Sequence, residues 1–187
     1  MMKQSRDGEV VCQGSVLVRD LCAAGSTAQA YPEIDNNPKN ELSVRALEGL
    51  VEHILEPIRA HFGSLTITHG FTSLALINRV PRGVARGLDQ HCAHEFNTRG
   101  SRICQRDGAS ADIYVAGIAS GELARYVYKY LPFDRMYLYG RDCPLHVSHS
   151  SQTSERQVVL MLAGAGGKRI PRVVGSSDIH GALSDYC

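Results

Sequence analysis

Apolar residues recur every three or four positions between Glu41 and Phe62, and this spacing predicts an amphipathic helix. The apolar positions are Leu47, Leu50, Val51, Ile54, Leu55, Ile58 and Phe62. Gly63 is placed to end the helix, because glycine accepts the left-handed conformation beyond a last turn. Pro57 has no backbone N–H and is therefore expected to kink the helix or to begin a second segment.

Short apolar or alternating stretches predict the strands of a sheet. These stretches are residues 65–69, 113–115, 135–139, 145–149 and 157–162. A second helix is expected from Ser120, acting as its N-terminal cap, to about Tyr130, because Pro132 cannot continue it. A few helices against a small, mostly antiparallel sheet give an α+β fold.

The two ends of the chain have weaker patterns. Residues 1–40 are expected to form an irregular segment, in which residues 16–18 add a short strand. Residues 41–163 form the predicted domain. Residues 164–187 are rich in glycine and serine and are expected to be a flexible tail.

The chain has 187 residues, 43% of them hydrophobic and 21% charged, as in one soluble globular domain. Its formal net charge of +1 gives no support for binding to nucleic acid or to an anionic membrane. No apolar run approaches the roughly 20 residues of a membrane helix, and no signal peptide is recognisable. We therefore expect a cytoplasmic protein with reduced thiols, since its six cysteines include no Cys-x-x-Cys pair.

Histidines and one carboxylate form the candidate chemistry. Two histidines and a carboxylate can hold a catalytic zinc and leave its fourth position open to water. His91, His94 and His146 are the candidate histidines, and Asp112 precedes an apolar strand, where an unpaired carboxylate would be costly to bury. The pattern alone also allows a second interpretation, in which Asp112 caps a turn and His146 is a hydrogen-bonded, half-buried histidine.

Several segments resemble the zinc D-Ala-D-Ala carboxypeptidase family of bacterial and phage enzymes, which shares its fold with the hedgehog signalling domain. The front half of the family is matched by residues 37–38, 47–59 and 65–73, and its zinc motif by Asp89-Gln90-His91, Gly108-Ala109-Ser110-Ala111-Asp112 and Leu145-His146-Val147-Ser148. The resemblance implies a hedgehog/DD-peptidase-like fold and a Zn²⁺ ion on His91, Asp112 and His146. His94 is the alternative to His91.

The chain also departs from the family pattern. Residues 95–107 fall where the family has almost none, and Thr72 stands where it has a substrate-binding arginine. Arg82, or alternatively Arg79 or Arg86, is the candidate to replace that arginine. The glutamate that serves the family as general base is missing, so Asp142 and, second, Glu95 are the candidate catalytic carboxylates.

The resemblance implies a zinc-dependent hydrolase that cleaves a peptide or another amide bond of a small substrate with water activated by zinc. One alternative is a non-catalytic binding module in which zinc supports the structure. Another is the same fold recruited to a different metal-assisted reaction. The enzyme is favoured, because structural zinc sites usually have four protein ligands rich in cysteine. Tyr137 is expected to pack at the core or its rim.

Overall fold

The computed structural model describes residues 8–80 and 86–187. Within them, one mixed sheet has the strand order β1-β2-β3-β5-β4-β6-β7. The strands are β1 (Val10–Cys12), β2 (Leu65–His69), β3 (Ala109–Tyr114), β4 (Arg135–Leu138), β5 (Leu145–His149), β6 (Gln157–Ala163) and β7 (Arg169–Val174). Only the β4–β6 pair is parallel among these strands, so the predicted α+β fold with a mostly antiparallel sheet is confirmed.

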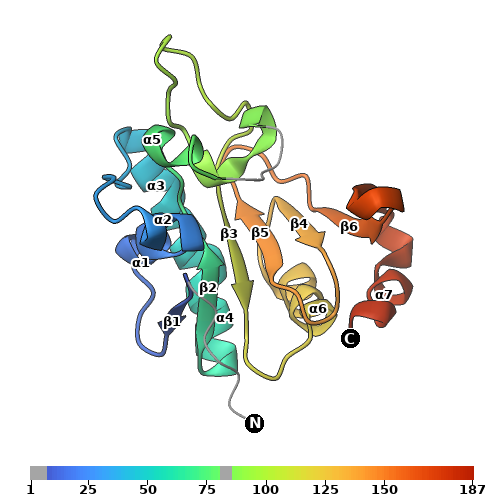
Figure 1. Ribbon diagram of the computed structural model, residues 1–187. Helices are drawn as coiled ribbons and strands as arrows, with labels where there is room; N and C mark the ends of the chain where they lie inside the picture. The colour runs from blue at the N-terminus through green and yellow to red at the C-terminus, as the bar shows by residue number, and fades with distance from the viewer. Residues whose placement is uncertain (1–7, 81–85) are drawn as a thin grey trace.

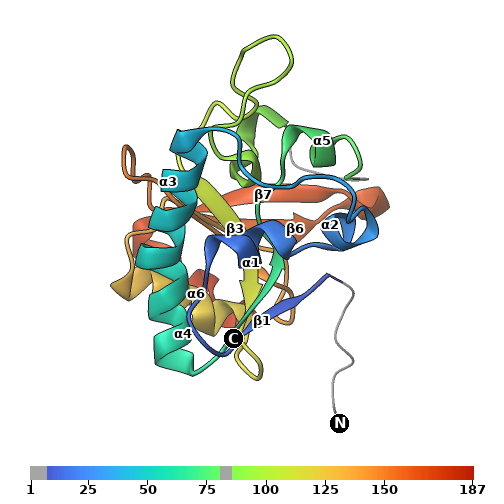
Figure 2. The same ribbon diagram turned by 90° about the vertical axis from the view of Figure 1, so that its left-hand side faces the viewer.

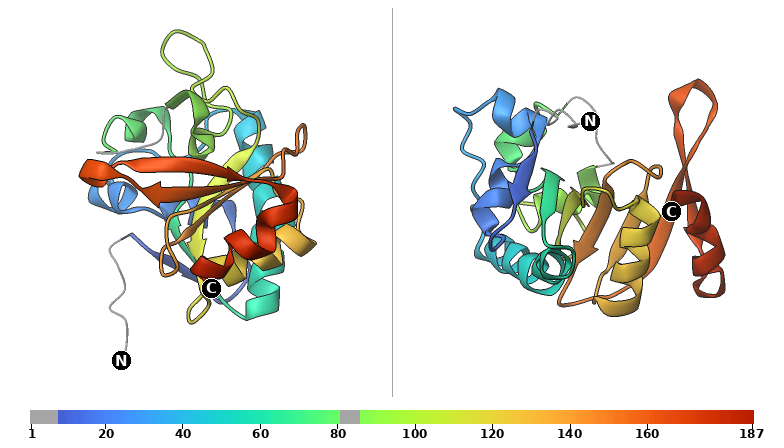
Figure 3. Two further views of the ribbon diagram at one scale, coloured as in Figure 1. Left: turned by 90° about the vertical axis from the view of Figure 1, so that its right-hand side faces the viewer. Right: turned by 90° about the horizontal axis from the view of Figure 1, so that it is seen from below.

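Helices cover one face of this sheet. The longer ones are α3 (Glu41–Leu50), α4 (Glu56–Phe62) and α6 (Ser120–Tyr130), which lie behind the strands in Figure 1 and below them in the right-hand view of Figure 3. Ala111 and Ile113 of β3 are fully buried in the core. Since side chains alternate along a strand, Asp112 projects from the opposite face, which no helix covers over β3, β5 and β4.

The long predicted helix is present in two segments joined by a π-helical turn, η1 (Val51–Leu55). In this turn the N–H of Glu56 donates to the Val51 carbonyl, and Pro57 lies in the first turn of α4. Figure 2 shows α3 and α4 as one column. The prediction of a second segment at Pro57 is therefore confirmed, and so is the end at Gly63, which has a φ of 84°.

The beginning of the chain is more regular than its sequence suggests. The strand predicted at residues 16–18 is wrong, because α1 (Val18–Ala23) begins there, with the Leu17 N–H donating to Asp20 Oδ2 at 2.8 Å. The prediction missed this local bond between a backbone donor and a side chain three residues later. Helix α2 (Ser26–Ala30) follows, and β1 extends the sheet beyond β2.

The end of the chain also contributes to the core. Residues 164–187, expected to be a flexible tail, contain β7 and α7 (Ile179–Ala182), and Ile179 and Leu183 are buried. A Cβ on Gly121 of α6 would lie 2.6 Å from the backbone of Tyr186, so the last turn packs directly on that helix. Two apolar residues four positions apart are too few to predict this packing from periodicity.

The remaining elements are short. They are α5 (Leu74–Ile77), η2 (Arg86–Leu88), η3 (Gln90–Cys92), η4 (Ala165–Gly167), η5 (Ser176–Asp178) and η6 (Ser184–Tyr186). Ser120 is the first residue of α6 rather than its cap, since its hydroxyl donates to the Gly140 carbonyl at 2.8 Å. No helix in the described part of the chain is both long enough and apolar enough to cross a membrane.

Candidate metal centre

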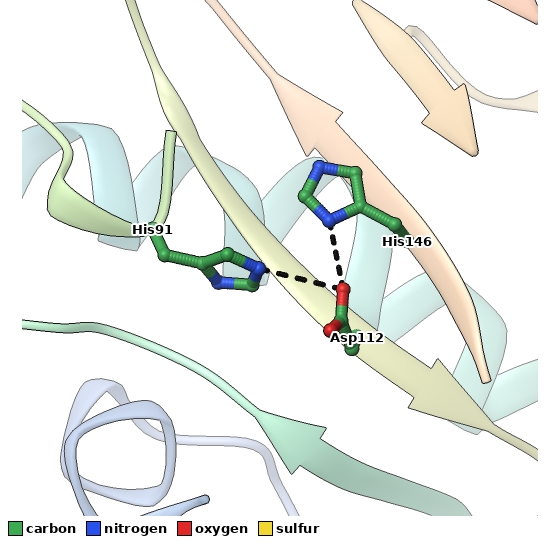
Figure 4. A group of neighbouring side chains, drawn as sticks. All are labelled: His91, Asp112 and His146. Carbon is green, nitrogen blue, oxygen red and sulfur yellow. Dashed lines mark hydrogen bonds and ion pairs between the residues drawn. The ribbon is translucent and has the colours of Figure 1, made fainter. Parts of the chain in front are cut away.

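Three side chains from distant parts of the sequence meet on the uncovered face of the sheet. Asp112 and His146 are direct partners across the antiparallel β3–β5 pair, and His91 reaches them from the turn η3. Figure 4 shows the three side chains pointing toward one another. The sheet register thus fixes two of the groups, and the loop before β3 supplies the third.

The distances between these groups suit a shared ion. His146 Nδ1 lies 2.7 Å from Asp112 Oδ1, and His91 Nε2 lies 3.4 Å from the same oxygen. One ligand atom from each residue lies within 4.8 Å of the others. Two ligands about 2.1 Å from one tetrahedral ion are about 3.4 Å apart, so small shifts would let all three bind one metal. This group could therefore hold a metal ion.

His91 is held in the orientation that a ligand needs. Its Nδ1 is 2.8 Å from the Gly70 carbonyl oxygen, to which it donates, so Nε2 is left facing Asp112. Its own backbone is fixed as well, because its carbonyl accepts from Thr72 N at 2.9 Å and its N–H donates to Asp89 Oδ1 at 3.1 Å. Ligating histidines commonly have such a carbonyl partner on the second ring nitrogen.

Electrostatics also favour a cation at this place. Burial lowers the pKa of His91, but the adjacent negative charge and hydrogen bond of Asp112 outweigh it and raise that pKa to about 9. Burial raises the pKa of Asp112, yet the charge of His91 and the bond to His146 hold it well below its usual range. Asp112 is thus an anion that requires a positive partner, which a proton on His91 or a metal ion can supply.

His69 borders the group without joining it. Its ring contacts the His91 ring with centroids 4.4 Å apart, and its Nε2 is 3.2 Å from the Thr72 hydroxyl. A register shift between Ile67 and His69 places it opposite Asp112 in the sheet. Burial, followed by the charge of His91, lowers the pKa of His69 to about 4, so this ring is neutral and packs beside the ligands.

His94, the alternative ligand, lies elsewhere. Its Nε2 accepts a hydrogen bond from Gly108 N at 3.3 Å. It lines a separate cavity of about 700 Å³ together with His53 and His149. Burial lowers the pKa of His94. The structure therefore groups His91, and not His94, with Asp112 and His146.

The predicted catalytic residues are not brought into the group. Glu95 is buried, and its Oε1 accepts the backbone N–H groups of Lys39 and Asn40 at 3.0 and 3.1 Å, which fixes the start of α3. Asp142 is exposed in the β4–β5 turn and lines a different cavity, of about 620 Å³. Arg82 lies outside the described residues.

Two further residues border the group and were not predicted as site residues. Tyr137 lies opposite His146 in the β4–β5 pair, and their rings meet edge to face with centroids 5.1 Å apart. Arg106 Nη1 donates to the Tyr137 hydroxyl at 2.9 Å. The alternation of residues 135–139 against 145–149 could have placed Tyr137 beside His146, but no local pattern points to Arg106.

Two imidazole nitrogens and one carboxylate oxygen form a ligand set that could hold a metal ion and leave a coordination position open. Comparisons with models of protein families, with curated proteins and with solved structures found no significant match to this chain. The ligand geometry and its place on the uncovered sheet face are therefore the observations that bear on function.

Proposed function

We propose that this protein is a zinc-dependent hydrolase of a peptide or another amide bond, with a hedgehog/DD-peptidase-like fold and a divergent sequence within the zinc D-Ala-D-Ala carboxypeptidase family. One observation carries the proposal: His91, Asp112 and His146 converge on the uncovered face of the sheet. These are the three residues that the sequence resemblance implies as ligands. The mostly antiparallel sheet with helices on one face is compatible with that fold.

Zinc, when bound, supplies a Lewis acid that polarises a carbonyl and lowers the pKa of water. The net reaction adds water across the amide: the hydroxyl oxygen bonds to the carbonyl carbon, the C–N bond breaks, and a proton reaches the leaving amine. The chain's own contribution is to orient the ligands. The Gly70 carbonyl fixes the His91 ring, and the Tyr137 ring supports His146.

The test measures turnover in matched histidine variants. The zinc-loaded protein is assayed against a panel of short L,L-, L,D- and D,D-peptides, together with His146→Ala and, as control, His94→Ala. We expect hydrolysis of at least one class, its loss in His146→Ala and its retention in His94→Ala, whose ring is outside the ligand group. Turnover that survives the removal of His146 would sink the proposal.

Two observations favour a second candidate, a non-catalytic module that binds a ligand around a structural zinc. Thr72 replaces the family's arginine, is 1% exposed and has its hydroxyl beside His69. Glu95 is engaged by backbone N–H groups and so does not stand in for the missing base. Robust turnover of any amide substrate would rule this candidate out.

A further inference from the structure

The loop between η3 and β3 brings an arginine close to the metal centre. Residues 95–107 form the loop at the top of Figure 1, which returns to the sheet at the start of β3. Arg106 Nη1 donates to the Tyr137 hydroxyl at 2.9 Å and to the Leu88 carbonyl at 3.3 Å. Tyr137 in turn packs on His146, so only one side chain separates the guanidinium from a proposed zinc ligand.

The backbone around Arg106 is fixed from several sides. Arg102 forms an ion pair with Asp107 at 2.7 Å and also donates to the Arg106 carbonyl at 2.5 Å. Gln90, next to His91, donates to the Asp107 carbonyl at 2.6 Å. A side chain held by an ordered backbone loses less entropy when it binds a ligand.

Arg106 differs from most of the half-buried arginines because no carboxylate balances its charge; among the described residues only Arg125, which donates to the His180 carbonyl and the Ser184 hydroxyl, shares this feature. Those with defined ion pairs are Arg59 with Glu56, Arg102 with Asp107 and Arg135 with Asp134, at 2.9, 2.7 and 2.6 Å. Arg106 is half-buried but forms no ion pair with any described residue, and its Nε and Nη2 groups donate to none of them. A half-buried guanidinium of this kind favours an anionic partner.

The tyrosine adds a second donor. Its hydroxyl oxygen accepts from Arg106, and the hydroxyl hydrogen donates to no described group. An oxyanion placed against this pair would receive hydrogen bonds from the guanidinium fork and from the hydroxyl. Arginine forks match carboxylates in a bidentate way, which adds geometric specificity to the charge.

We propose that Arg106 and Tyr137 form a carboxylate-binding subsite beside the metal centre, which selects peptides with a free carboxylate close to the bond that is cleaved. The cleavage part rests on the proposed hydrolase function, whereas the carboxylate binding does not. Arg106 lies on the inserted loop and Tyr137 lies on β4. The selectivity for a carboxylate is therefore determined by residues other than the three metal ligands.

Calorimetry on the zinc-loaded protein tests the subsite without relying on turnover. The probes are N-acetylated dipeptides of L,L, L,D and D,D configuration, each with a free C-terminal carboxylate or a C-terminal amide. We expect at least one carboxylate form to bind about 10- to 100-fold more tightly than its amide, as for a hydrogen-bonded charge pair. Arg106→Gln should remove this preference, and Arg106→Lys should retain only part of it, because lysine keeps the charge without the fork.

Arg99→Gln is the matched control, because Arg99 is an exposed arginine of the same loop whose side chain forms no hydrogen bond or ion pair with the described residues. It should leave the preference unchanged. Tyr137→Phe should weaken the binding of the carboxylate form and leave the binding of the amide form unchanged. If Arg106→Gln melts early, Arg106→Lys and Tyr137→Phe carry the test.

The outcomes separate the two proposals. Carboxylate-dependent binding that is lost in Arg106→Gln, without turnover of any peptide, supports the subsite and contradicts the hydrolase. Turnover with equal affinity for carboxylate and amide forms supports the hydrolase and overturns the subsite. A preference that persists in both Arg106 variants, or no binding of any carboxylate form, also overturns the subsite.

Discussion

Gly108 ends the inserted loop, four residues before Asp112, at a point where two backbones nearly touch. Its φ is +87°, and a Cβ built on it would lie 2.0 Å from the carbonyl oxygen of His149 at the end of β5. Contacts of a Cβ below 3.0 Å are essentially never seen. Gly108→Ala must therefore push β3 away from β5 at the end of this strand pair, where Ala109 lies opposite His149.

A second glycine, Gly100, separates the cost of the backbone clash from the cost of the left-handed conformation. Gly100 lies in the same loop with a φ of +75°, but a Cβ there would meet nothing within 4 Å. Gly100→Ala should thus cost only the left-handed conformation, about 1 kcal/mol. Gly108→Ala should add a backbone clash of the kind that overpacking causes, about 1–3 kcal/mol, for a total of about 2–4 kcal/mol.

Urea unfolding, monitored by circular dichroism, measures the free energy of unfolding of Gly108→Ala and of Gly100→Ala. For a chain of this size, about 1 kcal/mol corresponds to a melting temperature lower by about 2–4 °C, so the two variants should be readily distinguished. Equal destabilisation by both substitutions would refute the close approach of the loop to β5. The same result would remove the structural reason for glycine at position 108.

Three further predictions test other parts of the fold. Leu47→Ala should lower the free energy of unfolding by about 2–5 kcal/mol because Leu47 is fully buried, whereas Leu42→Ala, at a residue 54% exposed, should change it by less than about 0.5 kcal/mol in chemical denaturation. Deletion of residues 176–187 removes buried Ile179 and Leu183, so a melting temperature equal to that of the full chain would contradict the docked tail. Burial, followed by the charge of Asp35, raises the pKa of Cys22 to about 11. Alkylation of Cys22 in the native protein should therefore be slow at pH 8 and accelerate as pH rises toward 11, as mass spectrometry after an iodoacetamide pulse would show; fast reaction at pH 8 would disagree.

Local patterns predicted the elements whose signals are strong. The helix over residues 41–62 follows from its apolar spacing, and its break and its end follow from Pro57 and Gly63, which act through their own backbones. Strands β2 to β6 follow from short alternating or apolar stretches, whereas β1 and β7 were not predicted. In contrast, α1 depends on a bond between Leu17 N and Asp20, and the docked tail depends on two apolar residues, so neither produces a periodic signal.

The ligand group of His91, Asp112 and His146 was predicted from the family resemblance, and strand alternation alone could not assemble it. Alternation places Asp112 and His146 on sheet faces, but it does not pair β3 with β5, because α6 and β4 separate them in the chain. The choice between His91 and His94 depends on bonds to Gly70 and Gly108, which only the folded loop provides. For the same reason the sequence did not reveal Arg106, whose partner Tyr137 lies 31 residues away.

We propose that His91, Asp112 and His146 together hold one zinc ion, and a zinc titration against a competing chelator tests this most directly. The proteins compared are the natural chain, His91→Ala, Asp112→Ala, His146→Ala and the control His94→Ala. We predict one equivalent of zinc in the natural chain and in His94→Ala, and affinity weaker by at least about 100-fold in the other three, because each loses a direct ligand. Tight zinc binding that survives His91→Ala but not His94→Ala would contradict the account.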